Sequence, residues 1–356
     1  MSRVRRLGVV LLLLALVSAC TVVEPGRASP AGSGTGSAGG APTQITYDER
    51  SATFAPDFVK ARSTDVCALL DVEAAEKATG AKRASMRLST GLATCTLEVD
   101  KSRPAAGWDF SLSVGQRLTE GWEQASLAGT KVMRNPDISS KCEYLVPFAA
   151  GNVGLRAEIS YSQAANTGAQ PSDAQVCETG EQYLADVVLP KWKNPPQLAA
   201  GLTTPRIPLL GKDPCAALLA AVADIPDDPG EPRTVRLSDP YSCEGESGTA
   251  ISKYAVEFEI YSAILDLDGE PVQIGDFTTY RTGGIAAGGC AYQVAVLPDL
   301  LFSKEEKTIY NGGFTVGVGT CDETDIVQKA IDNLVRQPDA PEPKPGAQLI
   351  GDLTGT

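Results

Sequence analysis

The sequence predicts an α+β protein of two tandem duplicated domains, each an antiparallel sheet covered by an opening and a closing helix and cross-linked by disulfides. The first observation is cysteine spacing. Apart from Cys20, the cysteines form two groups of four, with gaps of 28, 47 and 35 residues in the first group and 28, 47 and 31 in the second, at an offset of 148. The second observation is that each half begins with a short helix pattern and continues with alternating strand patterns.

The composition limits the possible functions. The 356 residues are enough for two or three domains, and a hydrophobic content of 43% can fill their cores. There is no histidine, which excludes Ser-His-Asp and Cys-His catalysis, His-ligated zinc and a histidine pH switch.

Residues 1–19 have the pattern of a signal peptide. Three arginines precede an apolar run, Gly8–Leu16, that is too short to span a bilayer. The segment ends Val17-Ser18-Ala19-Cys20, which resembles the bacterial lipobox and implies that Cys20 is diacylated, for example by palmitate, and becomes the first mature residue. The alternative is an ordinary cleavage site beside an unrelated cysteine.

Surface charge favours covalent attachment to the membrane. The leader holds three of the 31 basic residues and none of the 44 acidic ones, so the mature chain would carry a net charge of about −16. Such a surface repels nucleic acid and anionic lipid headgroups. We therefore expect a lipid anchor on the outer face of the cell membrane and no nucleic-acid partner.

Three segments read as connections rather than folded domains. Residues 20–58 form a lipidated tether, since Ser29–Thr43 contains only Gly, Ser, Ala, Thr and Pro. Residues 193–208 form a Pro-rich linker between the domains, and residues 338–356 a disordered tail.

The first repeat, residues 59–192, is expected to open with a helix that Asp65 caps and that continues over Val72–Thr79 to Gly80. Strand patterns follow, interrupted by a helix pattern at Leu118–Leu127. A closing helix, Glu181–Leu189, ends at Pro190. The expected strands are Thr94–Val99, Trp108–Val114, Cys142–Val146 and Val153–Tyr161.

The second repeat, residues 209–337, follows the same plan. Asp213 is placed to cap a helix with Pro214 at its first position. Strands are expected at Tyr254–Leu265, Cys290–Val294 and Gly313–Val318, before a closing amphipathic helix, Asp325–Val335.

Export places the cysteines in an oxidising compartment, where disulfides persist. If each copy is closed and both copies agree, three pairings remain. We favour Cys67–Cys95 and Cys142–Cys177 in the first repeat, with Cys215–Cys243 and Cys290–Cys321 in the second. A metal site is not expected, because no Cys-x-x-Cys pair and no histidine exist.

The lipobox, the tether and the residues around the first cysteine of each repeat resemble a family of actinobacterial cell-envelope lipoproteins without known function. Members carry an Asp-Pro-Cys helix that opens a cysteine-bridged α+β domain, often in a single copy. The first repeat has Val66 in place of the proline. The resemblance implies no activity and no functional residues. The matching residues are Asp65, Cys67, Ala68, Leu69, Leu70 and Cys95, then Asp213, Pro214, Cys215, Leu218 and Cys243.

Two loops have patterns found at ligand sites. Asp266–Glu270 places carboxylates on alternate residues, as in half of a calcium loop. Its glycine, however, comes at position four of the loop and not at position six. The preferred interpretation is therefore an Asp-Gly turn of a hairpin. Gly283–Gly289 is glycine-rich but lacks the Lys-Ser/Thr of a phosphate loop, so a flexible loop is preferred.

Other residues offer weaker candidates for chemistry. Acidic pairs, Asp227–Asp228 and Glu305–Glu306, could serve a histidine-free glycoside hydrolase. Ser252–Lys253 and Ser303–Lys304 are adjacent and lack the Ser-x-x-Lys spacing. The three tryptophans are expected in the core, with an apolar pocket as the alternative: Trp108, Trp122 and Trp192.

These patterns favour a membrane-anchored binding module that is not an enzyme and has no cofactor. Its partner would be a small or hydrophobic ligand, or another envelope protein, bound in a cleft between layers or between domains. One alternative is a scaffold or assembly accessory protein without a small ligand, and a second is a wall-glycan hydrolase.

Overall fold

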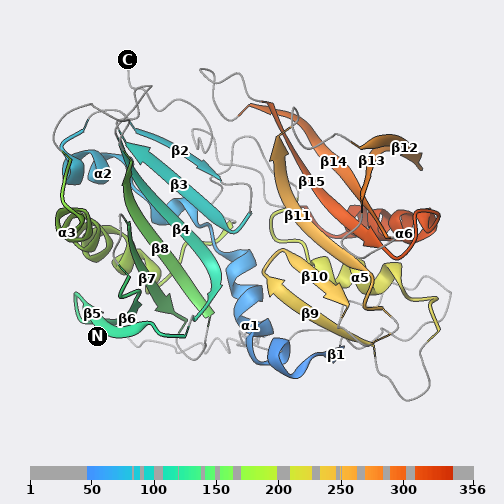
Figure 1. Cartoon of the computed structure of the whole chain (residues 1–356), viewed down its shortest axis with the longest axis horizontal. Coiled ribbons are helices and arrows are strands. Elements are labelled where there is room, and N and C mark those ends of the chain that lie inside the picture. The colour runs from blue at the N-terminus through green and yellow to red at the C-terminus, as the bar shows by residue number, and fades with distance from the viewer. Residues whose placement is uncertain are drawn as a thin grey trace, which may run out of the picture. The chain divides into compact units, whose positions relative to one another are not determined.

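The computed structural model is a mixed α+β fold with two sheets (Figure 1). Cys20 and the leader lie outside the described residues. Over the described ranges, no helix is both long and apolar enough to cross a membrane. The described residues are 46–81, 84–88, 92–99, 107–118, 120–137, 141–148, 153–162, 170–198, 209–226, 233–245, 249, 251–262, 269–283, 289–301 and 309–339.

A seven-stranded antiparallel sheet forms the first half, in the order β2-β3-β4-β8-β7-β6-β5. Buried residues alternate along its central strands, so that Leu97, Phe110 and Ile159 lie side by side in register on the core face. The strands are β2 (Ala84–Leu88), β3 (Thr94–Val99), β4 (Gly107–Arg117), β5 (Glu123–Leu127), β6 (Thr130–Arg134), β7 (Lys141–Pro147) and β8 (Val153–Ser162).

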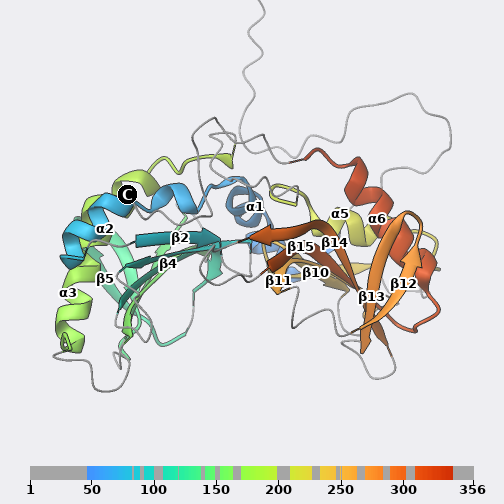
Figure 2. The ribbon, with the colours of Figure 1, turned by 90° about the horizontal axis from the view of Figure 1, so that it is seen from above.

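Helices α2 (Val72–Thr79) and α3 (Asp173–Tyr183) cover one face of this sheet (Figure 2). Asp65 caps only a short 3₁₀ turn, η1 (Cys67–Leu69), while Asp71 caps α2 and Gly80 ends it at φ 72°. The closing helix was expected to end at Pro190. It instead passes through a π-helical turn, η2 (Leu184–Val188), and continues as α4 (Leu189–Trp192) with Pro190 in its first turn.

The second half contains an eight-stranded sheet in the order β1-β9-β10-β11-β15-β14-β13-β12. From β9 onward, the strands follow one another as they do in the first sheet. The remaining strand, β1 (Thr46–Tyr47), comes from the start of the described chain and pairs in parallel with β9. The others are β9 (Thr234–Asp239), β10 (Ser242–Gly245), β11 (Ala255–Ser262), β12 (Glu270–Ile274), β13 (Phe277–Gly283), β14 (Cys290–Leu301) and β15 (Ile309–Val318).

Helices α5 (Pro214–Ala221) and α6 (Thr324–Arg336) pack on this sheet (Figure 2). Asp213 accepts a hydrogen bond from the Cys215 N–H, and Pro214 occupies the first position of α5, as expected. The buried face of α6 has helical spacing and consists of Ile326, Val327, Ala330, Ile331 and Leu334.

The expected tether extends too far into the chain, because residues 49–58 belong to helix α1 (Glu49–Ser63). Asp48 caps the helix, and Phe54, Phe58 and Ala61 form its buried face. The sequence prediction missed α1 because Pro56, in the helix interior, argues against a helix there, although the apolar spacing is helical.

One further local prediction was wrong, and another falls largely outside the described residues. Leu118–Leu127 is not helical, since β5 and β6 form a hairpin whose two-residue turn, Ala128–Gly129, has φ of 47° and 76°. Residues 266–268 lie outside the described residues, but the strands on either side of them, β11 and β12, are not neighbours in the sheet. The predicted Asp-Gly turn thus falls largely outside the described residues.

Four disulfides pair the cysteines as favoured from the sequence: Cys67–Cys95, Cys142–Cys177, Cys215–Cys243 and Cys290–Cys321. Their Cα–Cα distances of 5.0–5.4 Å are ordinary for disulfides. In the first half the first bond fixes the opening helical segment to β3, and in the second half it fixes α5 to β10.

Candidate functional site

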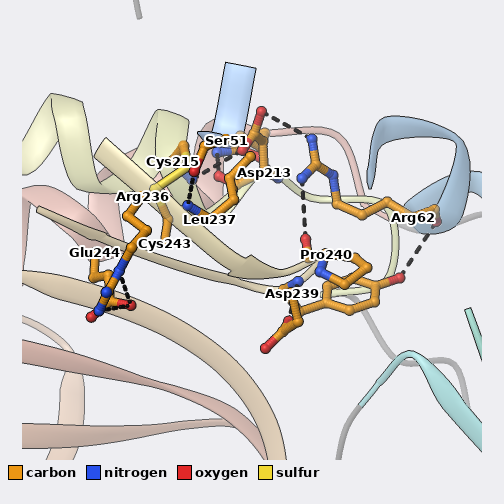
Figure 3. The surroundings of a disulfide bond; sticks show 12 residues. Ser51, Arg62, Asp213, Cys215, Arg236, Leu237, Asp239, Pro240, Cys243 and Glu244 are labelled. Carbon is orange, nitrogen blue, oxygen red and sulfur yellow. Dashed lines mark hydrogen bonds and ion pairs between the residues drawn. A yellow bond between two sulfur atoms is a disulfide. The ribbon is translucent and has the colours of Figure 1, made fainter. Parts of the chain in front are cut away.

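Helix α1 joins the two sheets, because it contacts β4 and β8 of the first and β9 of the second. Its buried Ser51 hydroxyl accepts the Leu237 N–H at 3.0 Å. At the other end of α1, Arg62 donates to the Pro240 carbonyl at 3.1 Å and pairs with Asp213 at 3.2 Å (Figure 3). Since the Arg62 side chain is only 8% exposed, these partners offset the cost of burying its charge.

The first sheet also contacts the second half directly. Gly115, in a bulge of β4, has φ 76°, and a Cβ atom there would lie 2.2 Å from the Pro240 ring. Only glycine allows this approach. Arg117, at the end of β4, donates to the Leu237 and Ser238 carbonyls and lies 4.3 Å from the centroid of the Phe54 ring. These contacts hold the two halves together through α1.

A polar cleft of about 520 Å³ lies beside the N-terminal end of α1. Arg50, Arg117 and Arg236 line it, together with Asp48 and Glu244. The pKa of Arg117 is lowered, chiefly by burial and also by the nearby Arg50 guanidinium. Arg236 pairs with Glu244 at 2.8 Å (Figure 3). Because Arg117 bonds to backbone carbonyls and Arg236 is neutralised, we interpret this cleft as part of the joint between the halves.

A second pocket, of about 460 Å³, lies beside the C-terminal end of α1, and we call it the Trp192 pocket. Its floor is apolar, with Phe148 and Trp192 rings 4.8 Å apart between centroids. The volume is within the range of small-molecule sites. The lining residues are Lys60, Ser63, Thr64, Thr130, Lys131, Val146, Pro147, Phe148, Trp192, Lys193, Pro195 and Gln197.

Four separate segments build the Trp192 pocket. The end of α1 forms one wall, and the ends of β7 and α4 supply the aromatic floor. A bridge between Thr64 and Gln197, and a hydrogen bond from the Asp65 N–H to the Pro196 carbonyl at 2.8 Å, fix the chain after α4 against the chain after α1. The pocket therefore depends on the end of α1, a helix whose first part, residues 49–58, was expected to belong to the tether.

Of the three tryptophans, Trp192 is 8% exposed and is both a core residue and part of the pocket floor. Trp108 is half-buried and edge-on to Tyr161, with ring centroids 5.4 Å apart, and Trp122 is half-buried between a turn and β5. The sequence left core and pocket roles open for these residues. The choice of Trp192 could not be made without knowing that Phe148 and α1 lie beside it.

The residue pairs that the sequence offered as catalytic candidates gain no support from the described structure. Lys253 pairs with Glu323 at 3.4 Å and forms no side-chain hydrogen bond with Ser252. Asp227–Asp228, Ser303–Lys304 and Glu305–Glu306 lie outside the described residues, as does most of Gly283–Gly289. Within the described part of the chain, no three acidic or cysteine side chains gather in a way that could hold a metal ion.

Among the described carboxyl groups, Asp65 and Asp239 have a raised pKa, in both cases chiefly through burial. Each caps a local turn: Asp65 accepts the Ala68 N–H and Asp239 the Tyr241 N–H. Neither residue lines the Trp192 pocket, whose lining contains no carboxylate. This arrangement gives no support to a hydrolase built from two carboxylates.

Comparison with known proteins adds little. No protein-family model matches the chain, and no curated protein is similar to it. A solved structure, the di-domain ARO/CYC StfQ from the steffimycin biosynthetic pathway, aligns over 76% of this chain and 89% of its own, at 9% identity and a TM-score of 0.15. A similarity of that size supports no conclusion about fold or function.

Proposed function

We propose that this protein is a non-enzymatic binding module of the cell envelope, anchored to the outer face of the membrane by lipid on Cys20. It takes a small hydrophobic ligand in the Trp192 pocket. The observation that carries this proposal is the aromatic floor, Phe148 against Trp192, in a pocket of ligand size. The lipobox, the signal pattern and the disulfides support the location.

The proposal includes duplication of one α+β unit and membership in the actinobacterial lipoprotein family described above. Its support is the matching cysteine spacing, the equivalent disulfides and the same strand order in both sheets. Among the described helices, α1 precedes only the first sheet, and the stretch that would match it in the second copy falls mostly outside the described residues. In this proposal the first copy is the binding domain.

Native mass spectrometry of protein purified from its own membrane tests both parts of the proposal. We expect a bound species of defined mass, and an N-terminal peptide that begins at Cys20 and carries acyl chains. Empty protein would contradict ligand binding and favour the scaffold alternative, which crosslinking to envelope proteins would then test. An unmodified N-terminal peptide would contradict the anchor.

A blocking variant ties the ligand to the pocket. Ser63, half-buried on the pocket wall, can be changed to Trp to fill the space, while Ser252→Trp adds the same side chain at an exposed site of the second half. Ser63→Trp should lose the bound species and Ser252→Trp should keep it. Retention by both variants would place the ligand elsewhere.

A further inference from the structure

The lining of the Trp192 pocket is positively charged, whereas the chain as a whole is negatively charged. Acidic residues outnumber basic ones by 44 to 31 in the whole sequence. The pocket lining nevertheless contains three lysines, Lys60, Lys131 and Lys193, and no acidic residue. A local excess of positive charge on an acidic protein attracts anions to that place.

The three lysines are not equivalent. Lys60 is held by Asp57 at 3.3 Å, and its ammonium lies 5.8 Å from the centroid of the Phe148 ring. Lys131 and Lys193 are exposed, and neither forms an ion pair or a side-chain hydrogen bond with the described residues. They come from β6 and from the residue after α4, on different elements of the pocket. Two uncompensated ammonium groups are thus available at its rim.

These charges lie next to apolar surface. Val146, Pro147 and Pro195 extend the floor formed by Phe148 and Trp192. A neutral hydrophobic molecule would use the floor but leave both free lysines without a role. A purely ionic ligand would use the lysines but leave the aromatic floor uncovered. A molecule with an acidic group at one end and an apolar body satisfies both surfaces.

We propose, on the basis of the binding function above, that the Trp192 pocket takes an amphiphile with an acidic head group. Lys131 and Lys193 bind the head group, and the apolar body lies on Phe148 and Trp192. Carboxylate and phosphate heads share the required chemistry, because both present anionic oxygens to ammonium donors. The remaining aliphatic length of each lysine can lie against the apolar chain.

The test uses three probes with the same eight-carbon chain: octanoate, octyl phosphate and octanol. Each is titrated into the mature protein, and binding is followed by calorimetry and by tryptophan fluorescence. We expect at least one anionic probe to bind about tenfold more tightly than octanol, the size expected for two ion pairs at a partly exposed site. The comparison of octanoate with octyl phosphate identifies the head group.

Substitutions assign the effect to the pocket. The double variant Lys131→Gln, Lys193→Gln should bind the preferred anion about tenfold more weakly and leave octanol binding unchanged. Lys77→Gln, an exposed lysine of α2 away from the pocket, is the matched control and should behave as wild type. Added salt should weaken binding of the anion and not of octanol.

The outcomes separate the two proposals. Octanol binding as tightly as both anions, or a double variant that keeps full affinity for the anion, would overturn the acidic head group and leave the hydrophobic site intact. If none of the three probes binds and the protein purified from membranes is empty, the binding function itself is contradicted.

Discussion

The buried carboxyl group of Asp65 makes a pH-dependent contribution to stability. One oxygen accepts the Ala68 N–H, while the other is buried without a hydrogen-bond partner in the structure. Burial raises the pKa of Asp65 to about 6, against the opposing effect of the Ala68 and Cys67 N–H groups. The folded protein then binds the Asp65 proton more tightly than the unfolded chain, so this group's contribution to stability falls as pH rises from about 4 to about 6.

Replacing Asp65 by Asn tests this assignment. Asn keeps an acceptor for the Ala68 N–H but carries no charge, so we expect Asp65→Asn to be more stable than wild type at pH 7 by about 1–3 kcal/mol and nearly equal to it at pH 4. Urea unfolding at pH 4, 5, 6 and 7 measures the difference. A gain that does not change with pH would contradict the mechanism.

Asp213 provides the control for Asp65→Asn, because it too lies two residues before the first cysteine of its half. Asp213 pairs with Arg62 across the joint, so Asp213→Asn leaves a buried guanidinium without its carboxylate, although its hydrogen bond to the Pro240 carbonyl remains. That variant should be destabilised at pH 7, opposite in sign to Asp65→Asn.

At the scale of elements, we expect substitutions on the buried face of α1 to have the largest effect on the free energy of unfolding. Phe58 is fully buried on this helix, 5.1 Å from Phe54 between ring centroids. We expect Phe58→Ala to cost about 3–5 kcal/mol of unfolding free energy through the cavity it leaves, and chemical denaturation measures this loss. Val59→Ala, on the exposed side of the same helix, is the control and should change stability little. Equal effects would mean that α1 does not pack as described.

Local signals explain which elements the sequence could predict. Asp71, Gly80 and the Asp213-Pro214 pair are caps with a physical preference for their positions, so the helix ends they mark were predictable. The β5–β6 hairpin was missed because Ala128 occupies a left-handed position where Gly or Asn is typical. The pocket was missed because its wall, α1, contains Pro56 and follows a tether-like segment.

At the scale of the whole molecule, the described chain from residue 46 onward should unfold as one unit. Arg62, Gly115 and Arg117 link the halves, and β1 belongs to the second sheet although it precedes the first. We expect a single calorimetric transition with equal calorimetric and van't Hoff enthalpies. Tryptophan fluorescence, which reports the first half only, should change at the same temperature as far-UV circular dichroism. Two separated transitions would show that the joint is weak.

The position of β1 also affects the order in which the chain can acquire its structure. Thr46 pairs with Thr234, so the partner of the first described strand lies nearly two hundred residues later in the chain. Contacts so distant in sequence form slowly. Until β9 has formed, α1 has only one of its two sheets to pack against. The first described strand is thus fixed in place late, and α1 completes its packing only when the second sheet has formed.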